Sequence, residues 1–283
     1  MKFSKLLYWL LIVILAAVFL ISGSFVARYA IDALSQKEEY DALAQIVEQA
    51  RSETVPPTEP PVPAEPDSDP APEAPSEPAE PTEPSLLPEY AALYEKNTDM
   101  VGWLTIDGTS VNYPVMQTPD RVDYYLKRNF SGAYSAHGCL YARESCDVFA
   151  PSDNVTIYGH HMNDGSMFAS LKKFRYQSFW EEHHAVQFDT LYEHHTYTVF
   201  AVFTTTASLG KGFAYHQFEN AKDEADFDDF IATCKELSLY DTGITPKYGD
   251  KIICLSTCEY TQTNGRLVVA AVRDPEGPPE QFE

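Results

Sequence analysis

The sequence predicts a mostly β domain, a small barrel with peripheral helices, preceded by a transmembrane helix and a proline-rich linker. Three observations predict this arrangement. Residues 6–27 are apolar and uncharged, and residues 55–88 hold 13 of the 20 prolines. Beyond residue 88, short runs of β-branched and aromatic residues alternate with turn-forming residues, which is typical of short strands. A length of 283 residues allows one domain of ordinary size besides these segments.

The apolar run at 6–27 is long enough to cross a bilayer as a helix. Lys2 and Lys5 precede it, whereas acidic residues accumulate after it. The positive-inside rule therefore predicts a cytoplasmic segment 1–5 and places the rest of this single-pass protein outside the cell. A cleaved signal peptide is the alternative, but its apolar core would span about 7–15 residues and precede a small-residue cleavage site. We favour an uncleaved anchor in the cell membrane.

Two segments are expected between the anchor and the folded domain. Residues 28–54 contain no proline or glycine and have partly periodic apolar residues, which predicts a helical stalk. Residues 55–88 carry eight acidic residues and no basic ones. Such a segment cannot bury a core, so we expect an extended, semi-rigid linker. Proline-rich segments also serve as ligands of polyproline-binding domains, but this one has no basic residue to anchor such a contact.

Residues 89–274 form the predicted folded domain, and a disordered tail is expected at 275–283. A helix over 88–102 precedes a hairpin in which the turn DGTS joins WLTI to VNYPVM. A short helix is expected over 120–130, and a longer one over 224–240 has an apolar stripe typical of a core helix. Further strands are expected at 138–142, 154–159, 185–192, 195–205, 251–258 and 266–273.

Charge and cysteine usage narrow the classes of function. The chain has 42 acidic and 20 basic residues, a net charge of −22. Because so acidic a surface repels phosphate backbones, we expect no nucleic-acid partner. An odd number of cysteines without a CxxC motif does not form a complete disulfide framework, so at least one thiol is free or pairs with another chain. The five cysteines are Cys139, Cys146, Cys234, Cys254 and Cys258.

The segment at 251–273 combines a thiol with a cation. Two β-rich runs flank a polar loop that contains Asn264-Gly265, a strong hairpin signal. Cys258 ends the first run and Arg266 opens the second, so hairpin pairing would bring both to the same end of the sheet. Cys254 shares a face with Cys258, but at about 3.3 Å per residue it lies about 13 Å away, too far for a disulfide. We therefore expect Cys254 to pack and Cys258 to react.

A reactive thiol needs partners, since only the thiolate is nucleophilic. A nearby cation favours the thiolate, and a guanidinium can donate two hydrogen bonds to a substrate oxygen. A histidine can assist the thiol and protonate a leaving amine. The eight candidates are His137, His160, His161, His183, His184, His194, His195 and His216.

His160 is the histidine best placed by the sequence. It follows the apolar strand at 154–159, and the end of a rigid element is a favourable place for a site residue. The pairs at 183–184 and 194–195 lie among charged residues and are expected to be solvated. Adjacent residues of a strand point to opposite faces, and no HExxH or CxxC motif is present, so we expect no metal site.

Two motifs resemble signatures of class B sortases: NVTIYGHHMNDGSMFASLKKF at 154–174 and LSTCEY…GRLVV at 255–269. The segments at 94–117 and 124–130 are similar to the N-terminal helices and first strands of that family. The segment DFDDFIATCKELSLYDTGI at 226–244 resembles the helix that class B enzymes insert before the catalytic strand. The resemblance covers nearly all of residues 89–273 and includes the order His, Cys, Arg.

This resemblance implies a membrane-anchored cysteine transpeptidase with a closed eight-stranded β-barrel and no cofactor. By residue-to-residue correspondence, His160, Cys258 and Arg266 would be catalytic. The residues that would line the substrate groove are Leu126, Ser256 and Glu259. His161 would be a structural neighbour of the catalytic histidine.

The implied reaction joins two partners outside the cell. The Cys258 thiolate would attack a Thr carbonyl in the C-terminal sorting signal of a surface protein, NPxT-like or LPxTG-like. An amine of a peptidoglycan precursor, or a lysine of a pilin in a polymerising enzyme, would then resolve the thioacyl intermediate. A papain-like hydrolase would place Cys before His, the reverse of this chain. A non-catalytic surface β-barrel that binds a partner is the remaining alternative.

Overall fold

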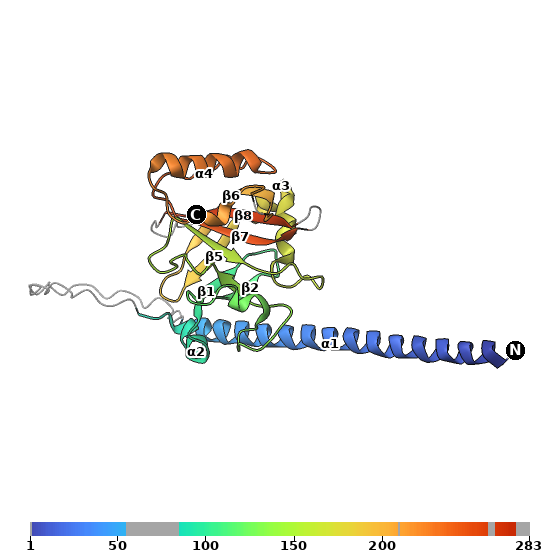
Figure 1. Ribbon diagram of the computed structural model, residues 1–283. Helices are drawn as coiled ribbons and strands as arrows, with labels where there is room; N and C mark the ends of the chain where they lie inside the picture. The colour runs from blue at the N-terminus through green and yellow to red at the C-terminus, as the bar shows by residue number, and fades with distance from the viewer. Residues whose placement is uncertain (1, 55–84, 209, 260–263, 276–283) are drawn as a thin grey trace, which may run out of the picture.

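The computed structural model describes residues 2–54, 85–208, 210–259 and 264–275. The predicted proline-rich linker, apart from residues 85–88, lies outside these ranges, and so does the predicted tail apart from residue 275. The described chain comprises one long helix and a β-barrel domain with short helices around it (Figure 1).

Eight strands close a barrel in the order β1-β2-β3-β4-β7-β8-β6-β5, which confirms the predicted fold class. Neighbours are antiparallel except β2–β3 and β4–β7, which are parallel. Closure gives every strand of the barrel a neighbour on both sides, which removes exposed sheet edges. The strands are β1 (Met100–Thr105), β2 (Asn112–Met116), β3 (Leu140–Ala142), β4 (Asn154–Tyr158), β5 (Ala185–Thr190), β6 (Thr196–Thr206), β7 (Ile252–Glu259) and β8 (Gly265–Arg273).

The two strands that carry the thiol and the cation are buried on both faces. Alternate residues of β7 and β8, such as Leu255 and Val269, fill the barrel interior. The residues between them, such as Cys254 and Ala270, pack in a second cluster beneath α4 (Glu224–Leu237). Figure 1 shows α4 lying across this side of the barrel. Burial on both faces explains why these strands are almost continuously apolar.

The shorter helices connect the strands. α2 (Pro88–Lys96) has a proline in its first turn, where the missing N–H costs nothing. The predicted helix over 88–102 is therefore too long, because Met100–Gly102 pair with β2 and β5 in the barrel. The segment predicted as a helix at 120–130 contains only the 3₁₀ turn η1 (Tyr124–Lys127). The others are η2 (Phe168–Arg175), α3 (Gln177–Glu182) and η3 (Tyr215–Gln217).

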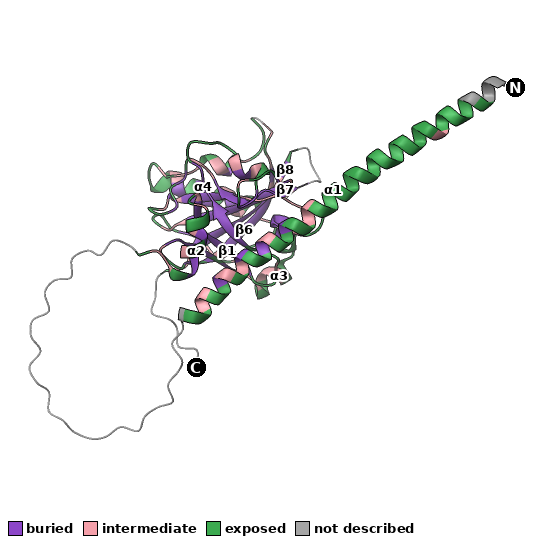
Figure 2. Ribbon diagram, turned by 90° about the horizontal axis from the view of Figure 1, so that it is seen from below, coloured by how far each residue is buried: buried purple, intermediate pink, exposed green. Residues whose placement is uncertain are grey.

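The helix α1 (Lys2–Thr54) runs through the predicted anchor and the predicted stalk without a break. Its first half projects away from the barrel and is largely exposed (Figure 2), and it is long and apolar enough to cross a membrane. Its second half lies along the barrel, where Tyr40, Leu43 and Val47 are buried. Their spacing of three and four residues places them on one helix face. Residues 28–54 thus pack against the domain for much of their length.

Candidate active site

Cys258 and Arg266 are direct partners across the β7–β8 hairpin, as the turn signal predicted. Asn264 adopts a left-handed backbone conformation (φ 54°) next to Gly265, which begins β8. Asparagine tolerates this conformation better than other non-glycine residues. The hairpin therefore brings a thiol and a guanidinium to the same place with no contribution from distant segments.

Cys258 is the most accessible of the five cysteines. All five, each within the described residues, are free thiols, and the other four are buried. Burial raises the pKa of Cys146 to about 11 and of Cys139 to about 12, and it raises the pKa of Cys254 well above its usual value. These thiols stay protonated at neutral pH, so they are poor nucleophiles. Cys258 is the thiol that can reach a substrate.

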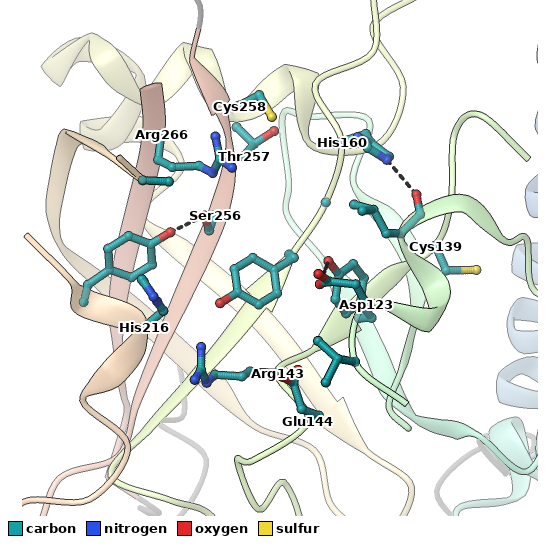
Figure 3. Close-up of a pocket in the computed structure, with 17 residues that line it drawn as sticks. Asp123, Cys139, Arg143, Glu144, His160, His216, Ser256, Thr257, Cys258 and Arg266 are labelled. Atoms are coloured by element: carbon teal, nitrogen blue, oxygen red, sulfur yellow. Dashed lines mark hydrogen bonds between the residues drawn. The ribbon is translucent and has the colours of Figure 1, made fainter. Parts of the chain in front are cut away.

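An open cleft of about 350 Å³ surrounds this thiol (Figure 3). Five of the six residues predicted for the site line it, and the sixth, Glu259, does not. The five lining residues are Leu126, His160, Ser256, Cys258 and Arg266. The cleft thus joins the ends of β4, β7 and β8 to the η1 segment.

His160 reaches the cleft because β4 and β7 are parallel neighbours. Tyr158 pairs with Ser256, so His160 and Cys258 each lie two residues beyond a matched pair. Gly159 permits the close approach of β3 and η2 to the end of β4: a Cβ there would lie 2.5 Å from the side chains of Leu140 and Phe168. The parallel register therefore places imidazole and thiol at the same end of adjacent strands.

The His160 ring is held by a backbone contact. Its Nε2 lies 2.7 Å from the carbonyl oxygen of Leu126, the dashed contact at the right of Figure 3. A carbonyl only accepts, so Nε2 carries a proton and donates it. This leaves Nδ1 as the ring nitrogen that can exchange a proton with groups in the cleft.

The Arg266 guanidinium is also positioned by backbone. Its Nη1 donates to the carbonyl oxygen of Gly265 at 3.0 Å. Among the described residues, no carboxylate lies within ion-pair distance of it. The positive charge therefore remains available to favour a thiolate or a developing oxyanion in the cleft.

Known proteins share this fold. A family model described as Sortase domain matches residues 104–274. This chain belongs to the sortase family. It is 33% identical over 186 residues to sortase B of Staphylococcus aureus, a match that spans 65% of this chain and 74% of that protein. It is 34% identical over 183 residues to sortase B of Listeria monocytogenes, spanning 64% and 72%.

Solved structures agree with this assignment. Sortase B of Bacillus anthracis in complex with AAEK1 superposes with a TM-score of 0.65 at 32% identity, covering 86% of this chain and 98% of that one. A Staphylococcus aureus sortase B–substrate complex gives a TM-score of 0.69 at 25% identity, with the same coverage. The protein is therefore a class B sortase, an enzyme of the cysteine transpeptidase type.

Two predicted groove residues of the sortase lie on the cleft wall. Ser256 is on the face of β7 that also carries Cys258, and its Oγ lies 2.5 Å from the hydroxyl of Tyr215. Burial raises the pKa of Tyr215, so this hydroxyl stays protonated. Leu126 contributes to the wall and, through its carbonyl, holds His160.

Glu259 lies behind the nucleophile. Unlike Ser256, Thr257 and Cys258, it is not among the residues that line the cleft. Its carboxylate is buried and pairs with Arg175 of η2 at 3.1 Å. The structure places Glu259 outside the groove and makes it a link between β7 and η2.

His161 contacts the nucleophile strand directly. Its ring hydrogen-bonds the backbone of Cys258. Burial and the charge of Lys172 lower the pKa of the His161 ring, against the opposing effect of that hydrogen bond. The ring is thus largely neutral at neutral pH and supports the end of β7.

Sequence reasoning missed the polar far end of the cleft. Its residues come from separate segments with no shared motif, so only the fold brings them together. Burial raises the pKa of Tyr158 to about 12, although Arg143 acts against this. The polar residues that line the cleft besides those predicted include Asp123, Tyr141, Arg143, Glu144, Tyr158 and His216, and Figure 3 shows Arg143 and Glu144 on the side away from Cys258.

Proposed function

We propose that this sortase cleaves a C-terminal sorting signal after Thr and transfers the surface protein, through a thioacyl intermediate, to an amine of a peptidoglycan precursor. The observation that carries the proposal is the pairing of Cys258 with Arg266 in a cleft that His160 also lines. The relatives support it, since one solved structure is a sortase B–substrate complex and another is sortase B complexed with triglycine. Triglycine offers a primary amine of the kind that the acceptor requires.

The first half-reaction forms the thioacyl intermediate. The Cys258 thiolate attacks the Thr carbonyl carbon, and Arg266 donates hydrogen bonds to the oxygen as it gains negative charge. The C–N bond then breaks, and His160 gives a proton to the departing amine. Since Nε2 is held by Leu126, the proton leaves from Nδ1.

The second half-reaction reverses these roles. An acceptor amine attacks the thioacyl carbon and loses a proton to Nδ1 of His160, and Cys258 leaves as thiolate. The new amide bond joins the surface protein to the acceptor. Each residue returns to its starting protonation state, so the cycle consumes no oxidant, metal or nucleotide.

The proposed location follows from α1. Residues 6–27 would anchor the protein in the cell membrane with residues 1–5 in the cytoplasm and the catalytic domain outside. Sorting signals and peptidoglycan precursors both reach the outer face of that membrane, so enzyme, substrate and acceptor would meet there.

A transpeptidation assay with the full-length enzyme in detergent tests this function. Peptides with NPxT or LPxTG cores are incubated with triglycine, and the products, measured by mass spectrometry, also identify the preferred motif. The parent enzyme should release the segment after Thr and form the triglycine-linked product, whereas Cys258→Ala should form neither. Cys234→Ala, which removes a buried thiol on the inner face of α4, is the matched control and should retain product formation. Equal product from the Cys258→Ala enzyme would refute the assignment.

A further inference from the structure

A buried histidine lies between the anchor helix and the catalytic domain. His137 is only 2% exposed. Its Nε2 donates to a carboxylate oxygen of Asp164 at 2.9 Å, and its Nδ1 lies 3.4 Å from a carboxylate oxygen of Asp32 without forming a hydrogen bond. Tyr29 stacks on the ring, with centroids 6.3 Å apart. Tyr29 and Asp32 belong to α1, so this one imidazole contacts the anchor helix and a loop of the barrel.

That loop is the one that carries His160, and we call residues 159–167 the His160 loop. Asp164 lies four residues beyond His160, and its other carboxylate oxygen accepts from the backbone N–H and the hydroxyl of Ser166. The carbonyl of His160 accepts from Phe168 at 2.9 Å. These hydrogen bonds close the loop into a turn, so a displacement of Asp164 would be expected to move His160.

A second contact chain links α1 to the end of the same loop. The rings of Tyr40 and Tyr113 meet edge to face, with centroids 5.1 Å apart. The Tyr113 hydroxyl accepts from the backbone N–H of Met167 at 3.3 Å. Met167 is fully buried at φ 54° and ψ −130°, a conformation that a non-glycine residue keeps only when its surroundings hold it. The second half of the His160 loop, at Asp164 and at Met167, thus has two contact chains that start at α1.

We propose that His137 is a positioning residue of the sortase reaction, which with Asp32 and Asp164 fastens the His160 loop to the anchor helix. The inference rests on the proposed role of His160 as the proton donor. The contact of His160 with Leu126 sets the orientation of the imidazole ring, whereas the backbone of the His160 loop sets its position. Because an error of about 1 Å in a catalytic group can cost about 100-fold in rate, a loosened loop would lower kcat.

Graded substitutions in the full-length enzyme test this proposal. His137→Phe removes both contacts and should lower kcat for a sorting peptide by about 10- to 100-fold, with KM within about twofold. His137→Gln keeps one donor and should recover part of that loss. Asp32→Asn, which keeps the shape and removes the charge on α1, should lower kcat by about threefold to tenfold. Should His137→Phe fail to fold, the other two variants carry the test.

A substrate-free measurement accompanies the kinetics. The His160 ring is followed by NMR in enzyme with labelled histidine, and its signal is assigned with His160→Gln. His137→Gln and Asp32→Asn should shift that signal. Failure of the parent enzyme to cleave any sorting peptide would refute the proposed function, and the NMR measurement would still test the coupling.

Two control variants separate positioning from general docking of α1. Arg51→Gln breaks the contacts of the far end of α1 with Asp189 and Tyr90. It should lower the melting temperature while the His160 signal and kcat stay within about twofold of the parent. Glu38→Gln, an exposed change on the same helix, should change neither. If the His137 and Asp32 variants lower the melting temperature as Arg51→Gln does but leave kcat and the His160 signal unchanged, His137 is structural only and the proposal fails.

Discussion

The β7–β8 hairpin and the His160 loop supply the two sides of one cleft, but they are held in different ways. In the hairpin, Cys258 and Arg266 are strand partners eight residues apart in sequence. In the loop, His160 is held by Leu126, which lies 34 residues away, and by a contact chain that reaches Asp32 on α1. The nucleophile side is thus local in sequence, and the proton-transfer side depends on the assembled tertiary structure. Substitutions on one side of the cleft should therefore leave the chemistry of the other side largely unchanged.

The largest effect is expected at the hairpin itself. Arg266→Lys keeps the charge but loses the planar pair of donors, so kcat/KM for a sorting peptide should fall by about 100- to 1000-fold. The fold should be unaffected, with an unchanged melting temperature. Arg273→Lys, at the other end of β8, should stay within about twofold in the same assay. A similar loss of kcat/KM in both variants would mean that any arginine substitution in β8 lowers activity, and that the effect is not specific to the guanidinium in the cleft.

A smaller effect is expected from displacing the loop while leaving the hairpin intact. In Gly159→Ala the new Cβ would lie 2.5 Å from Leu140 and Phe168, so the loop must shift. We expect kcat to fall by about tenfold to 100-fold. Alkylation of Cys258 by iodoacetamide should change by less than about threefold, because its contact with Arg266 is local. Parallel losses of both rates would show that the two sides are not independent.

A substitution behind the nucleophile strand should lower the stability of the fold and leave substrate binding unchanged. Glu259→Gln weakens the pair with Arg175 and should lower the free energy of unfolding by about 1–2 kcal/mol, since the arginine is partly exposed. KM for the sorting peptide should stay within about twofold, because Glu259 does not line the cleft. Urea unfolding and steady-state kinetics measure the two quantities. A tenfold rise in KM with unchanged stability would instead place Glu259 in the groove.

The smallest effect is expected at the far end of α1, remote from both sides of the cleft. A hydrogen bond to Asp189 raises the pKa of His194 despite partial burial. A pKa raised on folding gives stability that is present below the unfolded value of about 6.5 and is lost as pH rises through the folded value. His194→Gln should therefore lower the melting temperature by about 1–2 °C at pH 5.5 and by nothing measurable at pH 9. Calorimetry at the two pH values checks this, and an equal loss at both would contradict it.

The same division explains what the sequence could predict. The barrel strands, the apolar stripe of α4 and the pairing of Cys258 with Arg266 depend on local periodicity and on one turn, so they are visible in the chain. The position of His160 had a weaker signal, the end of an apolar strand, and its role came from the family resemblance. The placement of Glu259 in the groove came from the same resemblance, and the structure does not place it there.

Features that depend on contacts between distant segments left no recognisable pattern in the sequence. His137 meets carboxylates from 27 residues downstream and from the anchor helix, and nothing in its neighbourhood predicts this. His195 was expected to be solvated because charged residues surround it in sequence, yet it is 7% exposed. The helix predicted to reach 102 ends at Lys96, because strand pairing at Met100–Gly102 overrides helical propensity. The face of α1 that packs against the barrel appeared in the sequence as a partial apolar periodicity, but the sequence did not indicate what it packs against.

α1 runs as one continuous helix from the apolar segment to the surface of the barrel, which has a consequence for the proposed membrane location. Residue 27, where the apolar run ends, is only five residues from Asp32, a rise of about 7.5 Å along the helix axis. When the apolar half lies in a bilayer, no hinge in α1 separates it from the barrel. A helix adjusts to bilayer thickness by tilting, and that tilt would turn the barrel and the mouth of its cleft by the same angle. Under the proposed location, lipid composition would then set how the mouth of the cleft is oriented relative to the membrane surface.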